Sequence, residues 1–220
     1  MVATAVYLES GRKRVFACAL DWPGWCRSGK AEEAALQTLA AYVPRYASVV
    51  ELADLDAAGF RANAGDAFEV RERLAGNATT DFGAPAAFAA ADAEPVTKEQ
   101  AGRSTALLRA CWAYFDRVVA AAPAGLRKGP RGGGRDRDKI AAHVLGAETA
   151  YARKVGVKLR EPAIGDIGAI EAHRDAIAAV LEAPSDGTVP VPKGWPVRYA
   201  IRRLGWHVLD HAWEIEDRSG

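Results

Sequence analysis

Four histidines occur in the 220-residue chain, and three of them fall in patterns that could bind a metal ion. His207 and His211 are four residues apart, so on a helix they project from the same side about one turn apart. They share a stripe with Leu204 and Val208, the apolar face that packing would bury. His143 lies in a similar apolar stripe of an earlier segment. Three imidazoles are therefore predicted to point into one interior from two helices.

Burying three imidazoles together costs free energy unless a partner satisfies their nitrogens. A divalent metal does so, because it takes a neutral ring nitrogen from each histidine at about 2.0–2.1 Å and leaves a fourth position for water or substrate. Two histidines at i and i+4 with a third from elsewhere is a known way to build such a site. The alternative is that each histidine has its own local partner. The third histidine on a facing helix favours metal binding.

Two further residues bear on this site. The fourth histidine, His173, is close in the sequence to three charged residues, Glu171, Arg174 and Asp175. These neighbours favour a boundary position over a ligand role. Glu214 follows His211 by three residues and could orient its ring or act as a base near metal-bound water. The competing interpretation, which we favour, is a salt bridge to Arg218 four residues later.

Composition sets the class of protein. The chain is 50% hydrophobic and 26% charged with a net charge of +1, which is typical of a globular protein and not of a disordered one. The absence of a basic excess argues against nucleic acid as a partner. No run approaches the roughly 20 apolar residues of a membrane helix, and no signal peptide is recognisable. We expect a cytoplasmic protein that acts on a small molecule, with Cys18, Cys26 and Cys111 as free thiols.

Residues 1–75 predict a small α+β domain of order ββαβ. Alternation indicates strands at 4–9, 14–20 and 68–74, and a helix at 30–50 that Pro44 interrupts. Residues 76–96 carry little charge and two prolines, and are predicted to be a linker that packs partly on its neighbours.

Residues 97–220 predict an antiparallel four-helix bundle. The expected helices are 97–121, opened by a capping box at Thr97 and Gln100, then 136–155, 166–181 and 196–217. The last helix has a second stripe at Tyr199, Trp206 and Trp213. Either the N-terminal domain or a second subunit, as in a homodimer, is expected to cover it.

The segment 127–135 is rich in glycine and arginine and leads into the helix that bears His143. Backbone N–H groups at such a helix start can hold an anion. An exposed flexible linker is the alternative, and we favour it.

The segments 135–148 and 201–218, which carry the three histidines, resemble the DinB superfamily of four-helix bundles. That family places one metal-binding histidine on its second helix and two on its last, which match His143, His207 and His211 residue by residue. The resemblance implies a divalent metal, zinc or nickel. Several relatives use a low-molecular-weight thiol such as mycothiol in transfer or isomerisation reactions. The resemblance therefore implies that such a thiol is a possible second cofactor.

The first half resembles the HicB-like antitoxin domain. The likeness rests on the strand followed by Asp-Trp-Pro-Gly-Trp-Cys at 21–26, then Ser-Gly-Lys at 28–30 and the acidic pair Glu32 and Glu33, with Trp25 as one inserted residue. Those antitoxins normally add a DNA-binding module, which is not recognisable here. The likeness therefore implies a fold, and the balanced charge argues against an RNA-linked antitoxin.

Two functions follow as expectations. The first is a metal-dependent enzyme of the DinB type, a thiol-dependent S-transferase or a related hydrolase. The second is a non-enzymatic module in which the HicB-like domain binds a partner protein and the metal is structural or absent. In a scaffold, His173 or a carboxylate would fill the fourth metal position.

Overall fold

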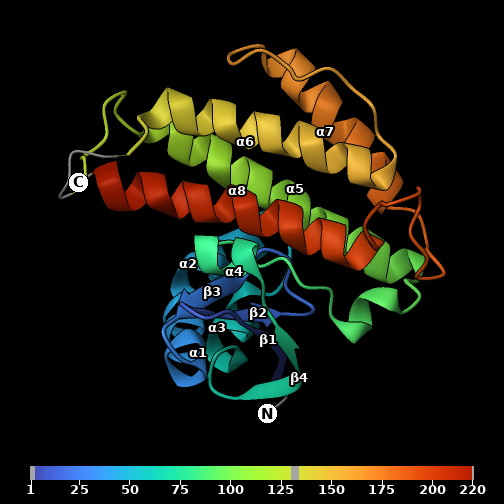
Figure 1. The fold of residues 1–220 in the computed structure, drawn as a ribbon. Coiled ribbons are helices and arrows are strands. Elements are labelled where there is room, and N and C mark those ends of the chain that lie inside the picture. The colour runs from blue at the N-terminus through green and yellow to red at the C-terminus, as the bar shows by residue number, and fades with distance from the viewer. Residues whose placement is uncertain (1–2, 130–133, 220) are drawn as a thin grey trace.

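Four strands in the N-terminal half form one mixed sheet with the order β3-β2-β1-β4. In the computed structural model, which describes residues 3–129 and 134–219, β1 spans Thr4–Ser10, β2 Val15–Ala19, β3 Cys26–Gly29 and β4 Phe68–Ala75. β1 pairs antiparallel with β2 and parallel with β4. Helices α1 Glu32–Ala41, α2 Val43–Leu52 and α3 Ala57–Asn63 connect β3 to β4 (Figure 1). The predicted α+β class is confirmed.

The predicted order ββαβ is incomplete, because it lacks β3 and α3. β3 is only four residues long and shows no apolar alternation, so its antiparallel pairing with β2 defines it. α3 starts after Asp56, whose carboxylate accepts the backbone N–H of Gly59 at 2.8 Å. The predicted break near Pro44 is confirmed, because α1 ends at Ala41 and Pro44 lies in the first turn of α2.

The segment 76–96, predicted as a linker, contains two short helices, α4 Ala78–Phe82 and η1 Ala90–Ala93. Glu9, fully buried in β1, accepts hydrogen bonds from the backbone N–H groups of Ala86 and Ala87. The carboxylate of Asp92 pairs with Arg202 of the C-terminal half at 2.6 Å. Long-range polar contacts therefore hold this segment against both neighbours. The domain boundaries at 75 and 97 stay a prediction.

The C-terminal half consists of long helices at the predicted places: α5 Lys98–Ala121, α6 Arg137–Ala152, α7 Ile167–Leu181 and α8 Val197–Ser219. The capping box at Thr97 and Gln100 is present, and α6 passes through η2 Arg153–Val155 to Gly156, which has φ +91°. α8 packs against α5 and α6, and α7 packs against α5. Among residues 3–129 and 134–219, no helix has the length and apolar character needed to cross a membrane.

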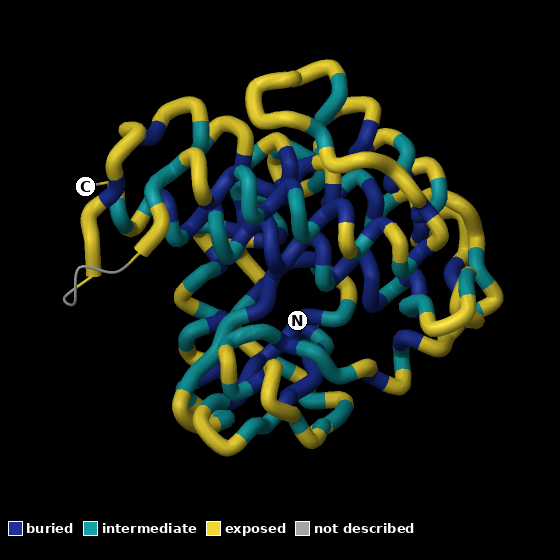
Figure 2. Tube along the Cα trace, turned by 45° about the horizontal axis from the view of Figure 1, so that its top comes forward, coloured by how far each residue is buried: buried dark blue, intermediate teal, exposed yellow. Residues whose placement is uncertain are grey.

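α8 lies between the other long helices and the N-terminal sheet (Figure 1). Trp206 meets Phe16 of β2 edge-on at 6.1 Å between ring centroids, and Trp213 meets Tyr42 at 4.8 Å. Tyr199 contacts Phe88 of the segment 76–96. The N-terminal half and the segment after it therefore cover the aromatic stripe. Buried residues run through this junction as well as through the helical layer (Figure 2).

Two glycines allow the turn before β3 to approach α8 very closely. Gly24 has φ +91°, and a Cβ added there would lie 2.8 Å from the Leu209 side chain and 3.0 Å from the Gly205 carbonyl carbon. A Cβ on Gly205 would in turn lie 3.1 Å from the Gly24 nitrogen. The two backbones thus contact each other directly where α8 crosses the turn before β3.

We expect Gly24→Ala to lower the free energy of unfolding by about 2 kcal/mol, because alanine meets a left-handed φ and a close contact together. Gly102→Ala is the matched control: it lies on an exposed part of α5 with open space around it, and should raise stability by up to about 1 kcal/mol. Urea unfolding of both variants measures the difference. A Gly24→Ala protein as stable as the parent would contradict the proposed role of this contact.

Candidate metal centre

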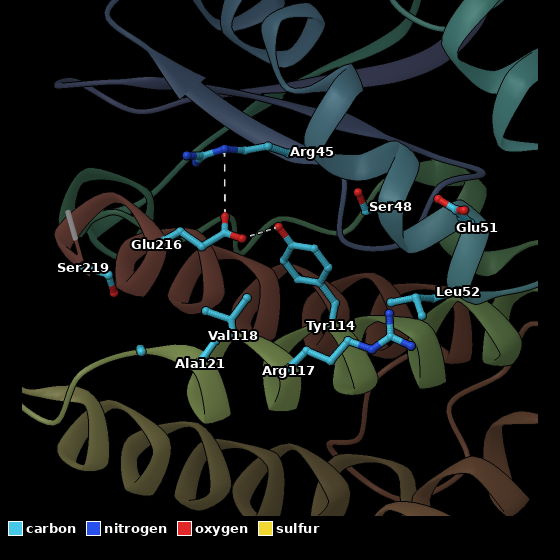
Figure 3. A pocket seen from close by; sticks show the side chains of 11 residues that line it. Arg45, Ser48, Glu51, Leu52, Tyr114, Arg117, Val118, Ala121, Glu216 and Ser219 are labelled. Carbon is cyan, nitrogen blue, oxygen red and sulfur yellow. Dashed lines mark hydrogen bonds and ion pairs between the residues drawn. The ribbon is translucent and has the colours of Figure 1, made fainter.

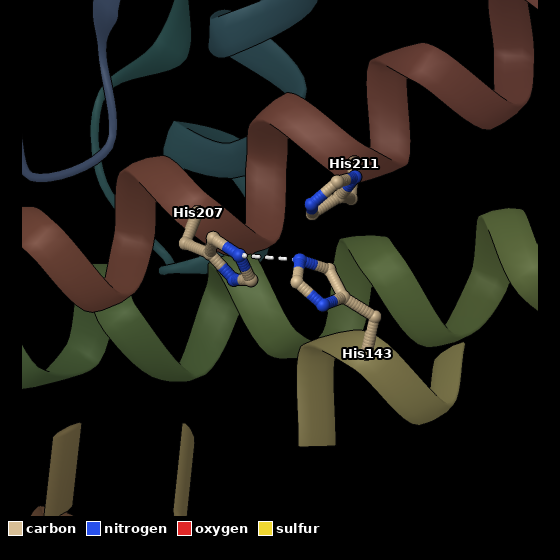
Figure 4. Close-up of side chains that lie close together, drawn as sticks. All are labelled: His143, His207 and His211. Atoms are coloured by element: carbon tan, nitrogen blue, oxygen red, sulfur yellow. Dashed lines mark hydrogen bonds between the residues drawn. The ribbon is translucent and has the colours of Figure 1, made fainter. Parts of the chain in front are cut away.

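The three histidines predicted to meet do lie together, between α6 and α8 (Figure 4). The Nε2 atoms of His143 and His207 are 3.3 Å apart. The ring centroid of His211 lies 4.9 Å from that of His143 and 4.7 Å from that of His207. One candidate ligand atom from each residue falls within 4.8 Å of the others. Among residues 3–129 and 134–219, this is the one cluster of three or more histidine, cysteine or acidic groups with such spacing.

Helix packing brings these side chains together. On α8, Leu204 and Val208 are buried to 1% and 0% exposure and place the same face against the core. On α6, Ile140 and Val144 are fully buried. The histidines follow the same periodicity, so the apolar residues that pack α6 against α8 also aim the imidazoles at one another. The i, i+4 spacing then places His211 one turn beyond His207.

His207 is the most enclosed of the three, at 7% exposure. Burial lowers its pKa well below the ordinary value, and the nearby His211, His143, Arg203 and Arg135 lower it further. Burial also lowers the pKa of His143. Both rings are therefore neutral at pH 7, which is the form that donates a lone pair to a metal.

Glu214 orients His211. Its Oε2 lies 2.8 Å from Nδ1 of His211, and its Oε1 accepts a hydrogen bond from Arg218 Nη1 at 2.6 Å. The hydrogen bond to His211 is the main cause of the lowered pKa of Glu214. The two roles predicted as alternatives, ring orientation and an ion pair with Arg218, are therefore combined in one side chain. A carboxylate on Nδ1 fixes the proton there and leaves the Nε2 lone pair for a ligand.

The donor set fits a divalent metal. Two nitrogens on a tetrahedral zinc with bonds of about 2.0–2.1 Å lie about 3.3–3.4 Å apart, which is the separation of Nε2 in His143 and His207. The ligand atoms of all three residues lie within 4.8 Å of one another. Nδ1 of His207 is buried and has no hydrogen-bond partner among the described residues. Among the described residues, no protein group satisfies all the nitrogens of the three rings.

His173 takes no part in this cluster. It lies on α7, and its Nε2 is 3.4 Å from the hydroxyl of Thr149. It is nevertheless buried, at 3% exposure, whereas its charged neighbours had indicated a boundary position. The neighbouring Arg174 is buried too, paired with Glu148 and Asp116, which is why charge alone misplaced this face.

None of the three cysteines belongs to the histidine cluster. All three are buried and free, as predicted. Burial raises the pKa of Cys111 far above its ordinary value, and burial together with Cys18 does the same for Cys26. A buried neutral thiol is a poor nucleophile.

The glycine- and arginine-rich segment is described only at its ends, since residues 130–133 lie outside the described part of the chain. Arg127 donates to the carbonyl of Asp217, and Arg218 donates to the carbonyl of Arg135. These bonds tie both ends to the end of α8. Anion binding by this segment stays a prediction.

Sequence reasoning gave no role to Arg203 and Tyr151, which lie next to His207. The Tyr151 ring is 5.6 Å from that of His207, and Arg203 donates to the Tyr151 hydroxyl at 3.2 Å. Spacing carried a signal for both: Tyr151 follows His143 by two helical turns, and Arg203 precedes His207 by one.

A separate surface groove lies between α2, α5 and the end of α8 (Figure 3). Tyr114 donates to Glu216 at 2.6 Å on its wall, and Arg45 approaches Glu216 from the opposite side. None of the three clustered histidines lines this groove.

Neither a family model, a curated protein nor a solved structure matches this chain. The resemblances to DinB bundles and to HicB-like domains therefore stay predictions, which rest on the residues that carry them.

We expect Glu214→Gln to weaken metal binding by about 10–100-fold while one equivalent still binds, because the ring of His211 loses its orienting carboxylate. Isothermal titration with Zn²⁺ measures both quantities. Glu216→Gln is the matched control on the same helix, since Glu216 faces Tyr114. Arg218→Met removes the ion pair with Glu214 but leaves the carboxylate on the His211 ring. Its affinity for Zn²⁺ should stay within a few-fold of wild type. Equal affinities in all four proteins would contradict the role given to Glu214.

Proposed function

We propose that this chain is a metal-dependent enzyme in which His143, His207 and His211 hold one divalent ion, zinc or nickel. The observation that carries the proposal is the meeting of three imidazoles from two helices in a largely buried seam. The two lowered pKa values favour the neutral, metal-binding form of His207 and His143. The proposal includes an antiparallel four-helix bundle of the DinB type, built from α5 to α8.

An open coordination position is part of the proposal. Three nitrogens leave one position of a tetrahedral ion free, and the candidates that a scaffold would use to fill it are engaged elsewhere. His173 is with Thr149, and the Glu214 carboxylate is on Nδ1 of His211 and on Arg218. This supports an enzyme over a module with a purely structural metal.

The reaction proposed is thiol-dependent S-transfer, with metal-assisted hydrolysis as the related possibility. When bound, the ion would lower the pKa of a coordinated thiol or water toward neutrality. In S-transfer, the thiol gives up its proton to solvent, sulfur forms a bond to an electrophilic carbon, and the leaving group departs with the electron pair.

The residues of this chain would bind the ion and hold its ligands in the required orientation. His207 stays neutral through burial, Glu214 fixes the tautomer of His211, and His143 completes the set from α6. Tyr151 and Trp195, whose rings are 5.0 Å apart, would keep bulk water from one side of the site.

We expect wild-type protein to bind one equivalent of Zn²⁺ or Ni²⁺, and His207→Ala to show no measurable binding at the same concentrations. Calorimetric titration together with elemental analysis of the purified protein provides the measurement. His173→Gln is the matched control and should bind like wild type, because His173 contacts Thr149 and not the cluster. Equal stoichiometry in wild type and His207→Ala would end the proposal.

An activity assay distinguishes the proposed enzyme from the non-enzymatic, protein-binding alternative. The metal-loaded protein should transfer a low-molecular-weight thiol to an electrophile, lose this activity on chelation, and regain it when the ion is restored. Metal binding without transfer or hydrolysis across a panel of thiols would favour the non-enzymatic, protein-binding alternative.

A further inference from the structure

Arg203 carries a positive charge without an acidic partner. Its side chain is half-buried on α8, and within residues 3–129 and 134–219 no carboxylate forms a salt bridge with it. Its Nη1 donates to the carbonyl of Pro85 and its Nη2 to the hydroxyl of Tyr151. Its Nε is buried and has no acceptor. Of five N–H donors, at least the one on Nε lacks a partner.

Other buried arginines of this chain are treated differently. Arg202, the preceding residue, pairs with Asp92 at 2.6 Å. Arg174 pairs with Asp116 at 2.7 Å and with Glu148 at 3.3 Å. Because desolvating a guanidinium is costly, such pairing is the expected arrangement. Arg203 has no such carboxylate. The missing acceptor on Nε does not by itself set it apart, because the Nε atoms of Arg14, Arg27 and Arg202 also lack a hydrogen-bond partner among the described residues. What is particular to Arg203 is its place beside the histidine cluster.

The position of Arg203 relates it to the proposed metal. It precedes His207 by four residues on α8, which corresponds to about 6 Å along the helix axis. Its partner Tyr151 lies on the face of α6 that also bears His143, and the Tyr151 and His207 rings are 5.6 Å apart. Arg203 and His207 thus have Tyr151 as a common neighbour, and a small molecule with one end at the metal would extend toward Arg203 past this ring.

The alternative explanation is that aromatic rings alone hold the guanidinium. Arg203 lies 4.7 Å from the centroid of Trp206 and 5.4 Å from that of Tyr151, both within the range of cation–π contacts. These contacts stabilise the charge, but they give no acceptor to the Nε–H, which lies in the plane of the group. Nη1 and Nη2 each use one N–H on Pro85 and Tyr151, and no carboxylate among the described residues balances the charge. A carboxylate is the acceptor whose charge and geometry match a guanidinium.

We infer that Arg203 is a specificity-determining residue that binds the carboxylate of a thiol or substrate whose other end reaches the three-histidine site. This inference rests on the proposed function and narrows it to ligands with an anionic end. Lysine would replace it poorly, because a single ammonium cannot offer two parallel N–H donors.

The test uses Co²⁺-loaded protein and two probes of equal length, 3-mercaptopropionate and 3-mercapto-1-propanol. Thiolate binding to Co²⁺ gives a charge-transfer absorption, so each affinity is read without turnover. In wild type we expect the carboxylate probe to bind about tenfold or more tightly than the alcohol, because a charged hydrogen bond to Arg203 is gained. In Arg203→Met this preference should fall to about one, while the affinity for the alcohol and the Co²⁺ spectrum stay unchanged.

Two further variants complete the test. Arg203→Lys retains a charge and should keep only part of the preference, and it serves if the methionine variant does not fold. Arg198→Met is the matched control on α8, since Arg198 contacts the carbonyl of Pro95 and not the histidines. It should behave like wild type.

The failures are distinguishable. A carboxylate preference of the same size in wild type, Arg203→Met and Arg203→Lys would overturn this inference, since the carboxylate would then bind elsewhere, for example to the metal itself. If wild-type protein shows neither the absorption of bound Co²⁺ nor the thiolate-to-Co²⁺ charge-transfer band, the proposed function is overturned, and this inference with it.

Discussion

The enclosure of three imidazoles between two helices is the constraint on which the arrangement depends. Each ring must present a nitrogen to the others, so α6 and α8 have to pack in one register. A shift of one residue on either helix turns a side chain by about 100° and removes it from the cluster. The fully buried Val144 and Val208 next to the histidines hold that register. Apolar packing therefore sets the polar geometry.

α8 serves two interfaces at once. One face bears the histidines, and another bears the aromatic residues that contact the N-terminal half. Consecutive residues divide accordingly: Arg202 pairs with Asp92 on the side of the sheet, whereas Arg203 lies beside Tyr151. Trp206 and His207 divide in the same way. Because the helix is rigid, the N-terminal half helps to hold the site in place without contributing a ligand.

The long helices and the histidine face could be predicted because both depend on local periodicity, capping residues and spacing. β3 could not, since its four residues become a strand only by pairing with β2. The structure of residues 76–96 depends on Glu9, some 77 positions earlier in the chain, which a local pattern does not reveal. The spacing from His207 placed Arg203 near the histidine face, but its contacts could not be predicted, because its partners Pro85 and Tyr151 come from distant segments. Metal binding itself stays a prediction.

The contact between Gly24 and Gly205 limits how this architecture can diversify. Because the two backbones meet without side chains between them, a Cβ at either position requires the opposite backbone to move by a few tenths of an ångström. Recombination that exchanged one half for a homologous one would have to preserve both glycines together. The junction thus couples the two halves sterically, although each has secondary structure of its own.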